Sequence, residues 1–340
     1  MKDNKISVGI IGGSGYTGRL LLKFCNDHAF VRDYTVYGNS TAGQTLHDVF
    51  PQLKGITVNQ VIGSVNDISM SHDVYFLALP HGEALNYVPG LVCSGKKIID
   101  LGGDYRLDTP ELYEKWYGKK HTSPELLINK QYGLADFYKN DISETQLIAN
   151  PGCYPTSVLL SLLPLVKNYA GSILTVSTVS YSGTSGAGKT PKTDLLMSEM
   201  FGNVRAYNVN KHRHQPEIFQ ELQKNGFNSP FAFTTHLLPV DAGIYSTTTV
   251  HLKEKIDRSE LDSCYASAYA ESGFVRLREL PPDLRWVTGT NFCDINVSPN
   301  ENTIIITATI DNLIKGAAGQ AIQNMNKIFG WDEKTGLTAN

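Results

Sequence analysis

The sequence predicts an α/β protein in which a doubly wound parallel sheet is combined with an α+β domain that has a mixed or antiparallel sheet. Two patterns predict this fold class. Before residue 150, short apolar runs alternate with helical segments, and each run closes in a loop rich in Gly and Pro. Beyond residue 172, apolar and polar residues alternate, as in strands with one buried face. A chain of 340 residues is long enough for two domains.

Composition narrows the class of protein. Hydrophobic residues make up 41% and charged residues 19%, which excludes a disordered chain. A net charge of -3 predicts neither a nucleic-acid nor a membrane partner, and no apolar run approaches the roughly 20 residues of a membrane span. No signal segment is expected, because residues 1–5 run directly into a predicted strand and no hydrophobic segment precedes it. Five widely spread cysteines without a C-x-x-C pair predict reduced thiols, a cytoplasmic location and no metal site.

The first predicted strand, residues 6–11, runs directly into a glycine-rich turn. Residues 13–18 fit G-x-G-x-x-G between this strand and a helix around residues 19–25. Small residues there let the backbone approach a pyrophosphate, whose charge lies at the helix N-terminus. A turn that serves packing alone is the alternative. We expect a bound dinucleotide in a Rossmann-type domain, contacted by Gly13, Ser14, Gly15, Tyr16, Thr17 and Gly18.

The loop after the second predicted strand, residues 34–38, bears on the choice of cofactor. An NAD site normally places Asp or Glu here to hold the ribose 2′-hydroxyl. This loop, residues 39–43, offers only neutral groups such as Ser40. Hydroxyls accommodate a 2′-phosphate that a carboxylate would repel, so the sequence favours NADP, although the loop contains no Arg or Lys.

Two further buried strands, residues 74–79 and 97–101, complete the predicted parallel sheet. Ligands collect at the carboxyl ends of such strands, which places His81 and Arg106 near the cofactor crevice. Pro80, at the end of the first of these strands, is expected to contact the cofactor. His81 fits better as a loop histidine hydrogen-bonded to backbone.

The sequence allows two interpretations of Arg106. Its guanidinium can hold a phosphate or carboxylate. Alternatively, it forms a surface ion pair with Asp104 or Asp108.

A single cysteine, Cys153, stands between a Pro-Gly corner and an apolar run, residues 157–166, that predicts a helix. At the start of a helix, the positive end of the dipole lowers a thiol pKa and makes the thiolate a better nucleophile. An inert buried cysteine is the alternative. We take Cys153 as the candidate nucleophile because the later part of the chain supplies histidines that can serve as its base, as described below.

A strand at residues 173–180 runs into a second small-residue loop, residues 182–189. Backbone N–H groups and hydroxyls around Ser182 and Gly183 can bind an anion, and Lys189 adds positive charge. A flexible connector is the alternative, but the position directly after a strand favours a binding loop.

Titratable side chains crowd the entrance of a helix near Pro216. A thiol nucleophile needs a base with a pKa near 7, which His212 or His214 supplies. Solvated histidines are the alternative. We slightly prefer His214, because it lies nearer the helix. Further strands are predicted at residues 231–238, 243–252 and 303–310, with helices at 260–272 and 311–322.

Five motifs in this order resemble the N-acetyl-gamma-glutamyl-phosphate reductases of arginine biosynthesis, and the resemblance covers nearly the whole chain. They are GGSGYTG at residues 12–18, NPGCYPT at 150–156, SGTSGAG at 182–188, HRHQPEI at 212–218 and DNLIKGAAG at 311–319. The resemblance implies an NADP-binding Rossmann domain, residues 1–150 and 313–340. A catalytic domain, residues 151–312, interrupts it and carries the interface of a homodimer or homotetramer.

The resemblance also implies roles for individual residues. Cys153 is the nucleophile that forms a thioester with an acyl phosphate, and one of His212 and His214 is the base. Asn312 joins the residues expected at the cofactor. Apart from the resemblance, Arg106 and Lys189 are the candidates for the substrate phosphate, and Glu217 is also expected at the substrate.

One departure from the family affects the substrate. Family members often carry Arg-Gly-Ile where this chain has Ala242-Gly243-Ile244. If that Arg meets the substrate, this chain accepts a different acyl group, N-succinyl or, less readily, the aminoadipyl homologue of lysine biosynthesis. Aspartate-semialdehyde dehydrogenase chemistry is a further alternative, because it shares the fold and the thiol. A non-catalytic NADP-binding sensor is the alternative from another class.

Overall fold

The computed structural model describes residues 5–138, 142 and 144–337. The chain divides into two compact units. Residues 1–151 and 317–340 form unit 1, and residues 152–316 form unit 2. Each unit contains one seven-stranded sheet. No helix among the described residues combines the length and apolarity needed to cross a bilayer.

Unit 1 is a doubly wound parallel sheet, as predicted. Its strand order is β3-β2-β1-β4-β5-β7-β6, and every neighbouring pair is parallel. The order reverses between β1 and β4, which makes the carboxyl end of β1 the switch point where ligands bind in such sheets. The strands are β1 (Ile6–Ile11), β2 (Val31–Gly38), β3 (Gly63–Ser64), β4 (Val74–Leu77), β5 (Lys97–Asp100), β6 (Gln131–Tyr132) and β7 (Leu147–Ala149).

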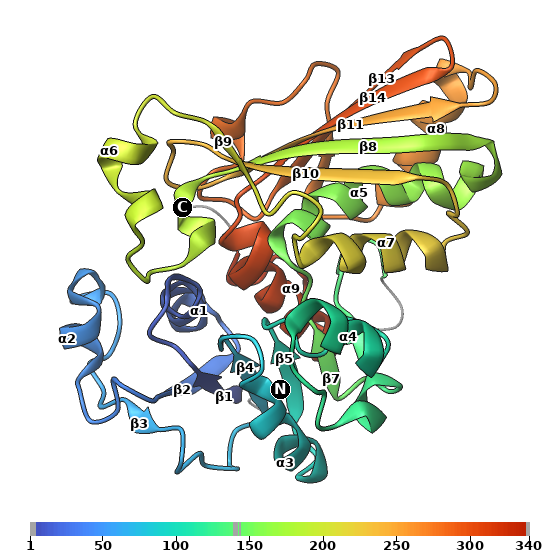
Figure 1. Ribbon diagram of the computed structural model, residues 1–340. Helices are drawn as coiled ribbons and strands as arrows, with labels where there is room; N and C mark the ends of the chain where they lie inside the picture. Colours follow the sequence, from blue (N-terminus) through green and yellow to red (C-terminus); the bar gives the residue numbers. More distant parts are fainter. Residues whose placement is uncertain (1–4, 139–141, 143, 338–340) are drawn as a thin grey trace. The chain divides into compact units, whose positions relative to one another are not determined.

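The helices of unit 1 are α1 (Tyr16–Asp27), α2 (Leu46–Val49), α3 (Val88–Cys93), α4 (Pro110–Tyr117) and α9 (Gly319–Ile328). Helix α9 comes from the far end of the chain, packs against α1, and lies among unit 1 elements in Figure 1. Its buried amides find partners there: Asn324 Nδ2 donates to Gly133 O at 2.9 Å and to Asn150 Oδ1 at 3.0 Å. Asn326 Oδ1 lies 2.7 Å from His28 Nε2. These contacts fix the closing helix in unit 1.

Unit 2 is built on a mixed sheet with the order β12-β13-β14-β11-β8-β10-β9. β8 pairs parallel with β10 but antiparallel with β11, so its neighbours are of both kinds. The strands are β8 (Ile173–Ser182), β9 (Arg205–Tyr207), β10 (Phe231–Leu237), β11 (Ile244–Leu252), β12 (Val275–Leu277), β13 (Cys293–Asn300) and β14 (Thr303–Ile310). The helices are α5 (Cys153–Tyr169), α6 (Met197–Met200), α7 (His214–Lys224) and α8 (Arg258–Tyr269), and α5 and α7 run along the sheet in Figure 1.

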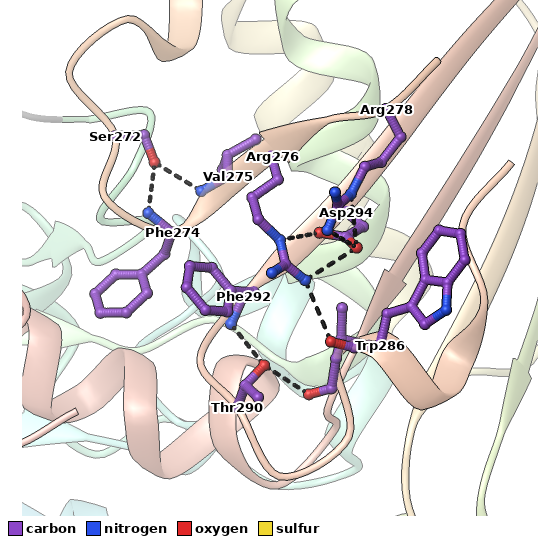
Figure 2. Close-up of polar contacts among 10 residues, drawn as sticks. Ser272, Phe274, Val275, Arg276, Arg278, Trp286, Thr290, Phe292 and Asp294 are labelled. Atoms are coloured by element: carbon purple, nitrogen blue, oxygen red, sulfur yellow. Dashed lines mark hydrogen bonds and ion pairs between the residues drawn. The ribbon is translucent and has the colours of Figure 1, made fainter. Parts of the chain in front are cut away.

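Strand β13 was not expected, because Asp294 and Asn296 interrupt its apolar pattern. Asp294 is fully buried and binds two arginines of the neighbouring segment. Arg276 Nε lies 2.5 Å from Asp294 Oδ1, and Arg278 Nη2 lies 3.0 Å from Oδ2. Figure 2 shows Arg276 between this carboxylate and the Phe292 ring, whose centroid is 4.0 Å from the guanidinium carbon. The buried carboxylate therefore joins β12 to β13 where an apolar residue would be expected.

Helix α5 is the centre of the unit 2 core. It is buried from Tyr154 to Val166 and packs on α7, α8 and three strands of the sheet. Pro164, inside the helix, has no N–H to donate to Leu160 O. The Tyr269 hydroxyl of α8 donates to Leu160 O instead, and Tyr265 Oη donates to Ser161 O at 2.6 Å. Side chains of α8 thus replace a bond that the proline removes.

Replacing Tyr269 by Phe should lower the free energy of unfolding by about 1–2 kcal/mol, because the buried Leu160 carbonyl loses its donor. Urea denaturation measures the loss. The matched background is Pro164→Ala, which restores a backbone N–H for that carbonyl, so that Tyr269→Phe should cost less there. Equal losses in both backgrounds would contradict this account.

Candidate functional site

The glycine turn after β1 has the geometry that a dinucleotide requires. A Cβ at Gly13 would lie 2.6 Å from Val36 Cγ1, and one at Gly18 would lie 2.2 Å from Gly13 O. A Cβ at Gly15 meets no described atom within 4 Å. Gly13 and Gly18 therefore serve close packing, whereas Gly15 leaves space at the N-terminus of α1. That division of roles is the one the dinucleotide fingerprint requires.

The N-terminus of α1 is suited to an anion. Its N-cap is Gly15, which has no side chain to satisfy the first N–H groups, and the first turn contains no acidic residue. At the end of β2, the buried Thr41 Oγ1 has no hydrogen-bond partner among the described residues. Ser40 and Pro80 are exposed. These features fit a dinucleotide whose pyrophosphate lies at α1 and whose ribose lies near the end of β2.

Arg106 is buried rather than at the surface. Its burial contradicts the surface location that the ion-pair alternative assumed. Its Nε donates to Asn150 O at 2.9 Å and its Nη2 donates to Leu101 O at 2.7 Å. These bonds tie the ends of β5 and β7 together just before the Pro-Gly corner. His81 Nδ1 accepts from Gly103 N at 3.1 Å, which confirms a loop histidine bonded to backbone.

Cys153 is the first residue of α5 and is partly buried. The helix begins earlier than expected, at the cysteine itself, with Gly152 as its N-cap. Gly316 packs closely on this residue: a Cβ at Gly316 would lie 2.6 Å from Cys153 Cβ. A larger residue at position 316 would therefore displace the nucleophile, a constraint that the sequence pattern did not reveal.

The peptide before Cys153 is held on both sides. Gly152 N donates to Glu217 Oε1 at 2.9 Å, and Gly152 O accepts from both Thr156 N and Thr156 Oγ1 at 2.9 Å. Glu217 is fully buried in the first turn of α7. The Glu217 carboxylate therefore contacts the backbone turn that directly precedes Cys153.

His212 and His214 lie beside each other at the start of α7, with ring centroids 4.8 Å apart. His212 Nδ1 accepts from His214 N at 3.1 Å, so Nδ1 carries no proton. Burial, followed by the charge of Arg213, lowers the pKa of His212 to about 4. His212 is therefore neutral at pH 7, with its remaining proton on Nε2.

Aromatic rings surround His212. The centroids of Tyr154, Tyr207 and Phe233 lie 5.3, 5.5 and 5.8 Å from its ring. The hydroxyls of Tyr154 and Tyr207 are 2.9 Å apart. Burial raises the pKa of Tyr207 to about 12 and raises that of Tyr154 further, so both phenols keep their protons at neutral pH. Tyr154 thus connects the cysteine's helix to the histidines.

The second glycine loop is braced from within unit 2. Asn312 Oδ1 accepts from Gly243 N at 2.6 Å, and its Nδ2 donates to Ser185 Oγ at 3.1 Å. Gly183 N donates to Gly243 O at 2.9 Å, while Lys189, the last residue of the loop, is exposed. Asn312 therefore holds the loop of Ser182 and Gly183 against the segment that contains Ala242.

Comparison with known proteins identifies the class first. Residues 7–145 match the model of the semialdehyde dehydrogenase NAD binding domain, and residues 153–312 match the semialdehyde dehydrogenase dimerisation domain. The chain is thus a semialdehyde dehydrogenase in the broad sense. Within this class it belongs to the N-acetyl-gamma-glutamyl-phosphate reductase family. It is 42% identical to the Desulfotalea psychrophila reductase, covering 98% of both chains, and 40% identical to that of Chlorobaculum tepidum, covering 99% and 98%.

Solved structures agree on the fold. Aspartate semialdehyde dehydrogenase II from Vibrio cholerae, complexed with ASA, matches with a TM-score of 0.74 at 16% identity, covering 96% of this chain and 98% of that one. Aspartate semialdehyde dehydrogenase with NADP from Candida albicans matches with a TM-score of 0.66 at 14% identity, covering 96% and 98%. At these identities the likeness establishes the fold alone.

Replacing Gly15 by Ala should weaken NADP binding by at least about tenfold, because the new methyl group takes the space left for the pyrophosphate. The thermal midpoint should not change. Gly18→Ala is the contrasting variant and should lower the midpoint, because its Cβ would collide with Gly13 O. Fluorescence titration with NADPH and thermal unfolding separate the two effects. Unchanged NADPH affinity in Gly15→Ala would place the pyrophosphate elsewhere.

Proposed function

We propose that this chain reduces N-acetyl-gamma-glutamyl phosphate to N-acetyl-glutamate semialdehyde and phosphate, with NADPH, in arginine biosynthesis. The observation that carries the proposal is Cys153, the first residue of a buried helix, with both sides of the preceding peptide fixed. The names of the relatives and the neutral loop after β2 support the substrate and NADP. The expected location is the cytoplasm.

The chemistry follows from the thiol. The Cys153 thiolate attacks the gamma-carbonyl carbon, a C–S bond forms, and the C–O bond to phosphate breaks, which gives a thioester. Bound NADPH supplies the hydride. Collapse of the resulting hemithioacetal breaks the C–S bond, and a proton returned to the departing sulfur accompanies release of the semialdehyde. Backbone N–H groups at the start of α5 stabilise the developing oxyanion.

His214 is the base in this proposal. A backbone N–H occupies His212 Nδ1, and a pKa of about 4 makes His212 a poor proton acceptor at neutral pH. We assign His212 the complementary role of a neutral donor through Nε2–H. A neutral imidazole with a lowered pKa can polarise a carbonyl in this way.

The acyl group and the phosphate contacts belong to the proposal too. Lys189 remains a candidate for the phosphate, whereas the two carbonyl bonds of Arg106 favour a role in fixing the turn before Cys153. Ala242, in place of the Arg that family members often carry, keeps N-succinyl and aminoadipyl substrates as alternatives to N-acetyl.

We further propose a homodimer or homotetramer that assembles through unit 2. The match to a dimerisation domain supports this assignment. Outward-facing residues of the sheet supply a suitable surface, because Tyr245, Thr247 and Thr249 of β11 are only partly buried while their neighbours along the strand are buried.

A steady-state assay with NADPH tests the proposed function. N-acetyl-gamma-glutamyl phosphate should give a higher kcat/KM than the N-succinyl, aminoadipyl or aspartyl phosphates. Cys153→Ser should bind NADPH normally yet lose turnover. Retained reductase activity in Cys153→Ser would end the covalent mechanism, and absence of turnover with all four substrates, together with an inert thiol, would favour an NADP-binding sensor.

The two histidines should differ in their kinetics. His214→Asn should lower kcat by roughly 10²–10⁴-fold, as loss of a general base does. His212→Asn should leave the shape of the pH–rate profile between pH 5.5 and 8 unchanged, because an imidazole with a pKa of about 4 is already neutral throughout that range. If the pH dependence of the rate disappeared in His212→Asn but not in His214→Asn, His212 and not His214 would be the base.

A further inference from the structure

Glu217 is a buried carboxylate that the reaction steps above do not use. It lies in the first turn of α7, is 0% exposed, and accepts a hydrogen bond from Gly152 N at 2.9 Å. Gly152 is the N-cap of α5, and Cys153 is the first residue of that helix. The carboxylate is thus one residue away from the nucleophile along the backbone.

Helix α5 lacks the residues that usually complete a helix start. In a capping box, the N-cap side chain and a Glu or Gln three residues later satisfy each other's backbone N–H groups. Here the N-cap is a glycine, and the residue three positions later is Pro155. Glu217 supplies the missing acceptor from a neighbouring helix, so that the cap of α5 is completed by α7.

The same helix carries the proposed base. His214 and Glu217 are three residues apart on α7, a spacing that places two side chains on the same face. Because Glu217 binds the N-cap of α5, one hydrogen bond connects the helix that begins with the thiol to the helix that begins with the imidazole.

We propose that Glu217 is a positioning residue for the reductase reaction, setting the Cys153 thiol relative to His214 through the Gly152 peptide. The proposal rests on the function proposed above. A misplacement of about 1 Å in an active site costs on the order of 10²-fold in rate. Complete burial of Glu217 favours this role over the direct substrate contact expected from the sequence.

Three variants test the proposal. Glu217→Ala removes the acceptor, whereas Glu217→Gln keeps an oxygen for Gly152 N. Glu221→Ala is the matched control, because Glu221 is also buried, lies one turn later on α7, and bonds to Lys224 Nζ at 2.7 Å. The measurements are kcat, KM for the acyl phosphate, thermal midpoint, and the rate of Cys153 alkylation by iodoacetamide against pH.

Glu217→Ala should lower kcat about 10²-fold with KM changed less than about threefold, and Glu217→Gln should recover kcat to within about threefold of wild type. Glu221→Ala should lose thermal stability and keep kcat within about threefold. Alkylation at pH 7 should be slower in Glu217→Ala and normal in Glu217→Gln, because a loosened turn removes the thiol from the helix N-terminus.

Three outcomes would overturn the proposal. Wild-type kcat in Glu217→Ala, or an equal loss in Glu221→Ala, would make the residue merely structural. Faster alkylation in both Glu217 variants would indicate that the carboxylate acts on the thiol by charge rather than by position. The alkylation measurements do not need turnover, so they stand even if the wild-type protein reduces none of the acyl phosphates.

Discussion

Burial of α5 fixes the position of the reactive thiol. A helix enclosed from Tyr154 to Val166 cannot shift without moving the core of unit 2. Side chains of two other helices supply hydrogen-bond partners where α5 lacks its own. Tyrosine hydroxyls of α8 donate to carbonyls near Pro164, and Glu217 of α7 accepts from the N-cap N–H. Cys153 is therefore located by tertiary contacts rather than by its own local sequence.

Two histidines with different surroundings lie at the start of α7, a helix that packs on α5. His212 lies among Tyr154, Tyr207 and Phe233, where burial keeps it neutral and a backbone N–H selects its tautomer. Burial and the backbone bond therefore leave His212 neutral with its proton on Nε2, and His214 lies beside it with the two ring centroids 4.8 Å apart. Two chemically identical side chains, two residues apart, thus lie in different surroundings, and this difference is the basis of the separate roles proposed for them.

Much of the fold was predictable because its strands are continuous apolar runs or regular alternations. β1 and β14 follow this rule, and the glycine turn after β1 was predictable from its own motif. β13 did not, because its Asp294 is buried against Arg276 and Arg278, partners that no local pattern discloses. The sequence predicted a mixed or antiparallel sheet for unit 2 and left the choice open, because alternation reports one buried face but not the direction of the neighbouring strand.

The candidate site divides in the same way. Cys153 and the histidines were visible from residue type and from helix starts, which are local signals. The contacts of Arg106, Asn312 and Glu217 were not, because each depends on a backbone group far away in sequence. Gly316 carries a steric requirement set by Cys153, and only the folded chain brings these two residues together.

The order of the two units along the chain has a consequence for synthesis. Unit 1 requires α9, which includes the Asn326 partner of His28, yet this helix is translated only after all of unit 2. Domains generally fold as they emerge from the ribosome. The nascent unit 1 therefore lacks its closing helix until the whole of unit 2 has been made.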